Sequence, residues 1–407
     1  MLSLRILHTS DWHLGRTLER QSRQGEQEAV MAEIVEIAQD QKCQLVLVAG
    51  DIFDTATPPA WAEALFYDTV KALADGGRRA VVVIAGNHDQ PQRLTAAQAL
   101  AQRMGIFILG LPQDVAQGGS QHLSCLASGP SWLELGWAGE GERAVIAALP
   151  YPSEARLGEL LSLDVAEEEL AAGYAKRVGE LFASLVSHFR PEIVNLAMSH
   201  LYVQGGKSSD SERPIQLGSA PAVPVELLGG AQYLALGHLH RPQSLPGGGG
   251  RYCGSPLAYG FGEAAQGKSV TIVDLEPGQE AKTQTIPLTQ GRTLQIWEAT
   301  SIAEVRELCS QGKDQNSWIR LDLHLKEETS PGEIRQLQEF SQSFVQIRLL
   351  VPLKEGAQRE RRAGLPVDKL FSRFFQEKTG QEPSSELIKL FLELLEEPGE
   401  ELEVVSA

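Results

Sequence analysis

Five separated segments of the sequence place acidic, amide or imidazole side chains directly after an apolar run that resembles a β-strand. The runs begin near residues 5, 45, 80, 192 and 233. The side chains that follow them are Asp11, His13, Asp51, Asn87, His88, His200, His238 and His240. A lone histidine after a strand is usually structural, but five of the nine histidines lie in these endings. This repetition indicates one shared metal site.

These residue types are ligands for divalent cations. Carboxylates, amide oxygens and imidazoles together favour borderline ions such as manganese, iron or zinc over calcium. Seven ligands exceed the needs of one tetrahedral ion, so we expect two ions held by Asp11, His13, Asp51, Asn87, His200, His238 and His240. Two ions about 3.5–4 Å apart can stabilise both the attacking and the leaving oxygen of a phosphoryl displacement.

Two of the clustered residues are expected to be catalytic. Asp51 is the natural bridging ligand because it ends a central strand beside both groups of ligands. His88 follows a ligand asparagine and is left free to touch the substrate. An imidazole at this place can stabilise or protonate the leaving oxygen.

The elements that position these residues alternate along the chain. The apolar runs are nearly continuous, as in strands buried on both faces, and helical patterns at 24–41, 60–75 and 166–189 lie between them. This alternation predicts an α/β fold of layered sheets and helices. In such folds ligands gather at the carboxyl ends of the strands, where the polar side chains are found.

The composition limits the functions that the chain can have. The net charge is −17, which argues against a free-standing polyanion binder but not against an anionic substrate held by metal ions. No apolar run is long enough to cross a bilayer and the N-terminus lacks a secretory signal, so we expect a cytoplasmic protein without membrane contact. The four cysteines are scattered, which predicts small buried side chains. Residues 205–210 lack the first glycine of a phosphate-binding loop, so no ATP site is expected.

The character of the sequence changes near residue 286. We expect a first domain at 1–285, a small α+β domain at 286–353 and a polar linker at 354–366. Two apolar helices are predicted within 367–397, followed by a flexible tail at 398–407. From the sequence alone, two interpretations of these helices are equally supported. They fold onto the chain's own core, or they dock into a partner. Their candidate partner-binding residues are Leu370, Phe371, Phe374, Phe375, Leu390, Phe391 and Leu394.

The motifs and their order along the chain resemble the signature of a known family. The segments that carry the resemblance are Asp11-x-His13, Gly50-Asp51, Gly86-Asn87-His88-Asp89, Ser199-His200 and Gly237-His238-Leu239-His240. Together they are similar to the signature of the calcineurin-like metallophosphoesterases. The longer phrases DWHLGR, GDIFD, SDSER, YLALGHLHRPQ and YCGSPLAYGF look like the D-subunit family of the bacterial SbcCD nucleases. The match covers most of residues 1–275.

The resemblance implies a layered β-sandwich flanked by helices and a manganese-dependent DNA phosphodiesterase. By analogy, Asp11, His13, Asp51 and His240 hold one ion, and Asp51, Asn87, His200 and His238 hold the other. His88 would contact the transition state. The family digests duplex DNA from the 3′ side and cuts single strands and hairpins. Its members act as dimers bound to a coiled-coil ATPase subunit, within a heterotetramer, and the unit at 286–353 would face DNA. The ATPase subunit then becomes the expected partner of the terminal helices.

Several further residues admit two interpretations. Arg16 and Arg213 are the candidate substrate-binding cations, with Arg20 and Arg23 as further candidates, although each is more often a solvated surface charge. Trp12 and Tyr259 suit base stacking or, more commonly, packing. Asp54 orients a histidine or caps a helix.

Two rival functions remain open at this level. Phosphoprotein phosphatases that resemble this fold usually carry Arg-Gly after the second aspartate motif, where this chain has Thr55-Ala56-Thr57. A small phosphodiester hydrolase of the same superfamily would not need the second unit and the apolar helices. A non-catalytic scaffold, or a metal sensor without turnover, should lack ligands or His88, and this chain has all of them.

Overall fold

The computed structural model describes residues 3–139, 141–153, 156, 167–209, 211–212, 221–324, 337, 341–350, 371–372, 374–376, 382–385 and 387–388. Contacts divide the chain into two units, Met1–Leu350 and Val351–Ala407. Three sheets lie in the first unit. None of the helices in the described part of the chain is long and apolar enough to cross a membrane.

Two large sheets form the centre of the first unit. The six-stranded sheet has the order β13 (Lys282–Pro287), β12 (Ser269–Leu275), β1 (Leu4–Thr9), β2 (Leu45–Ala49), β3 (Ala80–Ile84) and β4 (Ile106–Leu109). The seven-stranded sheet has the order β10 (Gln243–Ser244), β11 (Gly250–Tyr252), β9 (Tyr233–Gly237), β8 (Val194–His200), β7 (Arg143–Leu149), β6 (Trp132–Trp137) and β5 (Leu123–Gly129). β1 to β4 run parallel to one another, as do β7 to β9.

Alternate residues of the strands face two different apolar layers. Ile6 and Leu47 of the first sheet share a buried cluster with Ile146 and Leu196 of the second, so the two sheets pack face to face. Their neighbours along the strands, such as Val46, face a second cluster that includes α1 and α2. This double burial explains why the strands are apolar at nearly every position.

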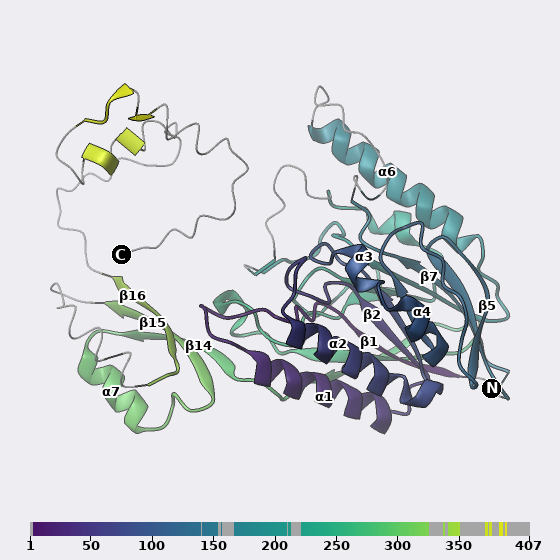
Figure 1. The fold of residues 1–407 in the computed structure, drawn as a ribbon, viewed down its shortest axis with the longest axis horizontal. Coiled ribbons are helices and arrows are strands. Elements are labelled where there is room, and N and C mark those ends of the chain that lie inside the picture. Colours follow the sequence, from purple (N-terminus) through teal and green to yellow (C-terminus); the bar gives the residue numbers. More distant parts are fainter. Residues whose placement is uncertain are drawn as a thin grey trace. The chain divides into compact units, whose positions relative to one another are not determined.

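Helices cover the outer faces of both sheets. Figure 1 shows α1 (Gln24–Asp40) and α2 (Ala60–Leu73) side by side along the first sheet. Tyr174, Val178 and Phe182 of α6 (Glu167–Val186) pack on the second sheet. Shorter helical elements are α3 (Pro91–Leu94), α4 (Gln98–Ala101), η1 (Asp75–Gly77), η2 (Gln102–Met104), η3 (Val225–Leu228) and η4 (Phe261–Glu263). The predicted layered β-sandwich flanked by helices is therefore confirmed.

A smaller parallel sheet follows the large ones. It contains β14 (Thr293–Ala299), β15 (Ser317–His324) and β16 (Phe344–Leu350), with α7 (Ile302–Ser310) between the first two strands. The side chain of Ser301 caps α7 by accepting a hydrogen bond from the Glu304 amide at 3.3 Å. Glu26 of α1 ties this sheet to the large ones, because its carboxylate accepts hydrogen bonds from Trp318 Nε1 at 2.8 Å and the Arg292 amide at 2.7 Å.

Several predicted segments fall outside the described residues. They are the linker at 354–366, most of the terminal helices predicted within 367–397 and the tail at 398–407. In the second unit, the Phe371 and Phe375 rings lie 6.1 Å apart, and Ser384 Oγ accepts a hydrogen bond from the Leu387 amide. The domain boundaries proposed at 285 and 353 stay predictions.

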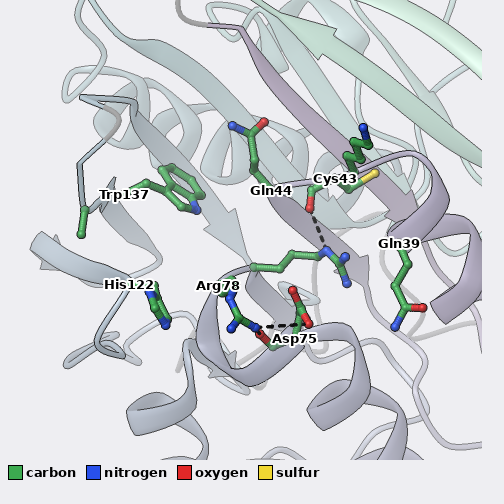
Figure 2. Close-up of a pocket in the computed structure, with 10 residues that line it drawn as sticks. Gln39, Cys43, Gln44, Asp75, Arg78, His122 and Trp137 are labelled. Atoms are coloured by element: carbon green, nitrogen blue, oxygen red, sulfur yellow. Dashed lines mark hydrogen bonds and ion pairs between the residues drawn. The ribbon is translucent and has the colours of Figure 1, made fainter.

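A cavity of about 390 Å³ lies beside the segments that enter β2 and β3 at their amino ends (Figure 2). Arg79 lines it, and this buried guanidinium donates to three main-chain carbonyls: Cys43 at 2.7 Å, Leu73 at 2.6 Å and Ala38 at 3.2 Å. Ala38 lies in α1 and Leu73 ends α2, so one side chain satisfies the carbonyl ends of both helices.

Candidate metal centre

The predicted ligands follow the carboxyl ends of five parallel strands, and several occupy an unusual backbone conformation. Asp11, His13, Asp51 and His238 have positive φ angles of 54°, 43°, 51° and 99°. Such angles are uncommon for residues other than glycine, and they persist where the surrounding structure imposes them. The loops after β1 and β2 pair with each other here: the Asp11 amide donates to the Gly50 carbonyl and the His13 amide to the Asp51 carbonyl, both at 3.0 Å.

Three glycines in the motifs make room for the site. A Cβ atom on Gly86 would overlap the Asp51 carboxylate, and one on Gly50 would overlap the His200 ring. A Cβ on Gly237 would overlap the Ala49 carbonyl oxygen. These three glycines, which precede Asp51, Asn87 and His238, therefore permit the close approach of the strand ends.

One group of ligand atoms comes from the segments that follow β1 and β9. Asp11, His13 and His240 each offer an atom within 4.8 Å of the others, and all three residues are buried. Nε2 of His13 lies 3.0 Å from Nε2 of His240. Asp11 is oriented from outside the group, because its carboxylate accepts hydrogen bonds from Ser10 Oγ at 2.6 Å and the His238 amide at 2.8 Å.

The second group lies on the other side of Asp51. Nε2 of His200 is 3.0 Å from Oδ1 of Asn87 and 3.3 Å from Oδ2 of Asp51. Nδ1 of His238 is 3.1 Å from the same Asn87 oxygen. Oδ2 of Asp51 also lies 3.6 Å from Nε2 of His13, so this carboxylate stands between the two groups.

The spacing of these atoms fits divalent cations. Ligand atoms that bind one ion at about 2.1 Å and at right angles to each other are separated by about 3.0 Å. The ring nitrogens of His13 and His240 have this separation, as do the Asn87 oxygen and the ring nitrogens beside it. His200 can present Nε2 as a lone pair, because its Nδ1 lies 2.8 Å from the Ala49 carbonyl oxygen, to which it can donate a proton.

The protonation of the site follows from burial and charge. Burial lowers the pKa of His13 and of His238 to about 3, so both rings are neutral at pH 7. Burial opposes ionisation of Asp51, but the imidazoles of His200 and His88 hold its pKa well below the usual range. Burial also acts against the charged form of His200, yet Asp51 raises the pKa of that ring to about 9. Burial raises the pKa of Asp11 to about 6.

His88 lies at the edge of the cluster. Its amide donates to Oδ1 of Asp51 at 2.9 Å, and its Nδ1 is 2.6 Å from the Asp54 carbonyl oxygen. Nε2 therefore faces the cluster, 4.0 Å from Oδ2 of Asp51. Its ring packs edge-to-face on His13. His88 also falls within ligand range of His13 and Asp51, so its position suits either the substrate or an ion.

Sequence reasoning missed the groups that hold His240. Glu263 is fully buried, and its Oε1 lies 3.2 Å from His240 Nδ1. Lys268 pairs with the same carboxylate and donates to the His240 carbonyl at 3.0 Å. Although burial acts against it, hydrogen bonding to His240 and the charge of Lys268 hold the pKa of Glu263 well below its usual range. Glutamate and lysine near a strand carry no local signal for this role.

Asp89 and Arg156 were also missed as supporting residues. The Asp89 carboxylate accepts three main-chain hydrogen bonds, from Ile52 at 3.1 Å, Phe53 at 2.9 Å and Gly86 at 2.8 Å. Arg156 donates to the Gly86 carbonyl at 2.8 Å and to the Asp89 carbonyl at 2.7 Å. These bonds fix the loops after β2 and β3 relative to each other. The signal for Asp89 was its place directly after the Gly-Asn-His motif.

The other predicted residues divide into three groups. Arg16 lies beside the cluster, where its Nη2 donates to the Ser211 carbonyl at 3.0 Å. Trp12 and Tyr259 are buried and serve packing: the Trp12 ring contacts Phe66, and the Tyr259 ring lies 5.4 Å from that of His13. Outside the described residues lie Arg213, Leu370, Leu390, Phe391 and Leu394.

The remaining predicted residues in the described part of the chain are Arg20, Arg23, Asp54 and three phenylalanines. Arg20 is exposed, whereas Arg23 is buried and pairs with Glu26 at 2.8 Å. Oδ1 of Asp54 lies 3.4 Å from Nδ1 of His13, and its role of orienting that histidine stays a prediction. In the second unit Phe374 is 56% exposed, and Phe371 and Phe375 are partly buried. Nothing in the described residues tests their predicted contact with a partner.

The sequence of this chain is similar to those of known proteins. The family model for calcineurin-like phosphoesterases matches residues 4–242, more than half of the chain. The D subunit of the SbcCD nuclease of Bacillus subtilis (strain 168) is 43% identical over 400 residues, which are 96% of this chain and 97% of the relative. The corresponding D subunit of Rhodobacter capsulatus is 35% identical over 70% of this chain and 69% of its own length. That of Escherichia coli (strain K12) is 27% identical over 91% of this chain and 92% of its own length.

The matches confirm the resemblance that the motifs indicate. The family model covers residues 4–242, and the match to the Bacillus subtilis relative covers 96% of the chain. This chain is a member of the calcineurin-like phosphoesterase family and, within it, of the family of nuclease SbcCD D subunits.

Proposed function

We propose that this chain is a metal-dependent DNA nuclease that hydrolyses phosphodiester bonds with two divalent cations, manganese being the expected metal. The observation that carries the proposal is the pair of ligand groups on either side of Asp51, with potential ligand atoms 3.0 to 3.6 Å apart. The names of the relatives, which describe nuclease subunits, support the choice of nucleic acid as substrate.

The ligands divide around the shared carboxylate. Asp11, His13, Asp51 and His240 would hold one cation, and Asp51, Asn87, His200 and His238 the other. When bound, the cations supply positive charge that polarises the phosphodiester and a hydroxide at neutral pH. The neutral rings of His13 and His238 keep their lone pairs available at pH 7, and the low pKa of Asp51 keeps its carboxylate charged.

His88 acts on the substrate itself. The Asp54 carbonyl accepts the proton of its Nδ1, and this hydrogen bond directs Nε2 toward the cluster. From this position a protonated ring donates to an oxygen of the phosphodiester and passes its proton to the leaving oxygen. Burial of the surrounding groups excludes water and strengthens this contact.

The proposal extends to the direction of DNA digestion, the protein partners and the cellular location. The relatives are named as the D subunits of nucleases, which implies a second kind of subunit in the same enzyme. We therefore assign this chain to a cytoplasmic complex in which a D-subunit homodimer binds a coiled-coil ATPase subunit, forming a heterotetramer. The complex would act as a 3′–5′ exonuclease on duplex DNA and as an endonuclease on single strands and hairpins, in DNA repair and recombination. The predicted terminal helices, which include the exposed Phe374, would bind the ATPase subunit.

The test is cleavage of end-labelled duplex and hairpin DNA by the full chain with manganese, with and without the ATPase subunit. We expect products only when a divalent cation is present, and loss of cleavage with a chelator. Hydrolysis of a small phosphodiester without any DNA cleavage, in the presence of the partner, would favour the alternative of a small-substrate hydrolase. A metal-loaded chain that is inactive on both substrates would favour the scaffold.

A further inference from the structure

A second cavity, of about 320 Å³, lies where the small sheet meets the loops around the metal centre. Three arginines line it: Arg16 from the loop after β1, Arg320 from β15 and Arg348 from β16. Gln346 adds an amide, and Glu19 is the carboxylate among the lining residues. The lining is therefore positively charged, in a chain whose net charge is −17.

The register of the small sheet places these side chains on one face. Arg320 is paired with Gln346, and Asp322 with Arg348, so all four side chains point to the same side of β15 and β16. The intervening residues Ile319, Leu321 and Leu323 are buried in the apolar cluster of α7. The sequence of β15 thus alternates between a core face and a charged face that lines the cavity.

Arg320 has an unused donor. Its Nη2 donates to Oδ2 of Asp322 at 3.2 Å, and its guanidinium lies 5.7 Å from the centre of the Phe261 ring. Nε of Arg320 is buried and has no hydrogen-bond partner among the described residues, and the same holds for Oδ1 of Asp322, with which Arg320 forms an ion pair. A buried N–H group without a partner is unfavourable, and in native structures it often marks the place of a ligand or water. The exposed side chain of Arg348 can reach the same ligand.

The cavity adjoins the metal centre through shared side chains. Ser211 lines the cavity, and its Oγ lies 2.6 Å from Nδ1 of His240. Tyr259 also lines it, and its ring lies 5.4 Å from His13 and 5.9 Å from His240. The Arg16 guanidinium lies 5.1 Å from the centre of the Tyr259 ring. Only one layer of side chains separates the cavity from the proposed ligands.

We infer that this cavity binds a phosphate of the nucleic-acid strand that flanks the bond to be cleaved, an inference that rests on the proposed function. Arginine suits this role because its planar fork of donors matches phosphate oxygens. A nucleic-acid strand carries a phosphate at every nucleotide, so a strand in the metal centre offers a second phosphate nearby. A small phosphodiester has one phosphate and cannot occupy both places. The cavity therefore makes the chain selective for polynucleotides.

The experiment compares two substrates in the metal-loaded full chain. We would measure cleavage of a DNA oligonucleotide and of bis(4-nitrophenyl) phosphate for wild type, Arg320→Gln, Arg348→Gln and the double variant. We expect the KM for DNA to rise about tenfold in the double variant, and the salt dependence of DNA binding to weaken by about one ion per arginine removed. The ratio of DNA cleavage to small-ester cleavage should fall about tenfold as well.

Arg78→Gln is the matched control. It removes the same charge from an exposed side chain that lines the other cavity, at the amino ends of the strands. Its ratio of DNA to small-ester cleavage should equal that of wild type. Melting temperature and manganese content confirm that each variant is folded and loaded. Arg348→Gln changes an exposed side chain, so it keeps the test valid even if Arg320→Gln does not fold.

The outcomes separate the inference from the proposed function. If wild type cleaves DNA and the double variant does so with the same KM and salt dependence, the cavity does not bind substrate. The same holds if Arg78→Gln and Arg348→Gln change the ratio equally, because the effect is then one of overall charge. If wild type hydrolyses the small ester and never DNA, the proposed function itself is wrong, and the inference falls with it.

Discussion

The two ends of β2 and β3 both hold buried charged groups, but these groups are satisfied in opposite ways. At the amino ends, the Arg79 guanidinium donates to three main-chain carbonyls at 2.6 to 3.2 Å. Beyond the carboxyl end of β2, Oδ2 of Asp51 lies 3.3 Å from Nε2 of His200 and 3.6 Å from Nε2 of His13. These side chains carry lone pairs that can bind cations, whereas Arg79 has donors only, and they already have main-chain partners.

The comparison teaches how to tell a functional charge from a structural one. Burial and charge alone do not distinguish Arg79 from Asp51, since both are less than 6% exposed. What differs is the surroundings: main-chain carbonyls accept from the Arg79 guanidinium, whereas side chains that can bind cations surround the Asp51 carboxylate. Arg320 differs from Arg79 in another way, because its Nε has no partner among the described residues. Mutations at the two ends should therefore affect different quantities.

The largest effect is expected for Asp51→Asn. The substitution keeps the shape of the side chain but removes the charge that both ligand groups share. We expect DNA cleavage to fall more than about a thousandfold, because both cations lose a ligand. Manganese content measured on the purified variant should fall in parallel. Full metal content with wild-type cleavage would contradict the bridging role.

His88→Ala distinguishes a residue that contacts the substrate from the neighbouring residues that bind the metals. It removes a group that we assign to the substrate rather than to the metals. We expect cleavage to fall about a hundredfold to ten-thousandfold while both manganese ions remain bound. Cleavage rates and metal stoichiometry must be measured on the same preparation. Loss of one ion would instead make His88 a ligand.

Arg79→Met tests the structural role of the buried guanidinium at the amino ends of β2 and β3. It leaves the Cys43, Leu73 and Ala38 carbonyls without their donor, so we expect the free energy of unfolding to fall by about 3 kcal/mol. The shift in the denaturant midpoint measures this loss. The rate of DNA cleavage per folded molecule should not change. Arg78→Met changes the exposed neighbour and should leave the denaturant midpoint unchanged. An equal shift in both variants would contradict the structural role of Arg79.

Glu263→Gln should give the smallest effect. Oε1 of Glu263 lies 3.2 Å from His240 Nδ1, and the substitution keeps the volume while removing the charge that orients the ring. We expect manganese affinity, measured by titration, to weaken about tenfold to a hundredfold. Cleavage at saturating manganese should recover most of the lost activity. An unchanged affinity would assign Glu263 to pairing with Lys268 alone.

The layered fold and the candidate site residues could be predicted from the sequence. Apolar runs and helical periodicity depend on local burial, so they predicted the strands and the helices at 24–41 and 60–75, observed as α1 at Gln24–Asp40 and α2 at Ala60–Leu73. Asp, Asn and His after glycine at a strand end are uncommon enough to be noticed one by one. The structure brings these side chains together, and their roles as ligands stay predictions.

The ordinary residues that support the site could be identified only after the chain's three-dimensional packing was known. Glu263 meets His240 across 23 positions of the chain, and Trp318 meets Glu26 across 292. Arg16 and Arg348 line one cavity although they lie in segments far apart in the sequence. Glutamate, lysine and arginine are common surface residues, and their identity says nothing about what they will face. A local pattern records which side of an element is buried, whereas the pairing of distant side chains depends on how the elements pack.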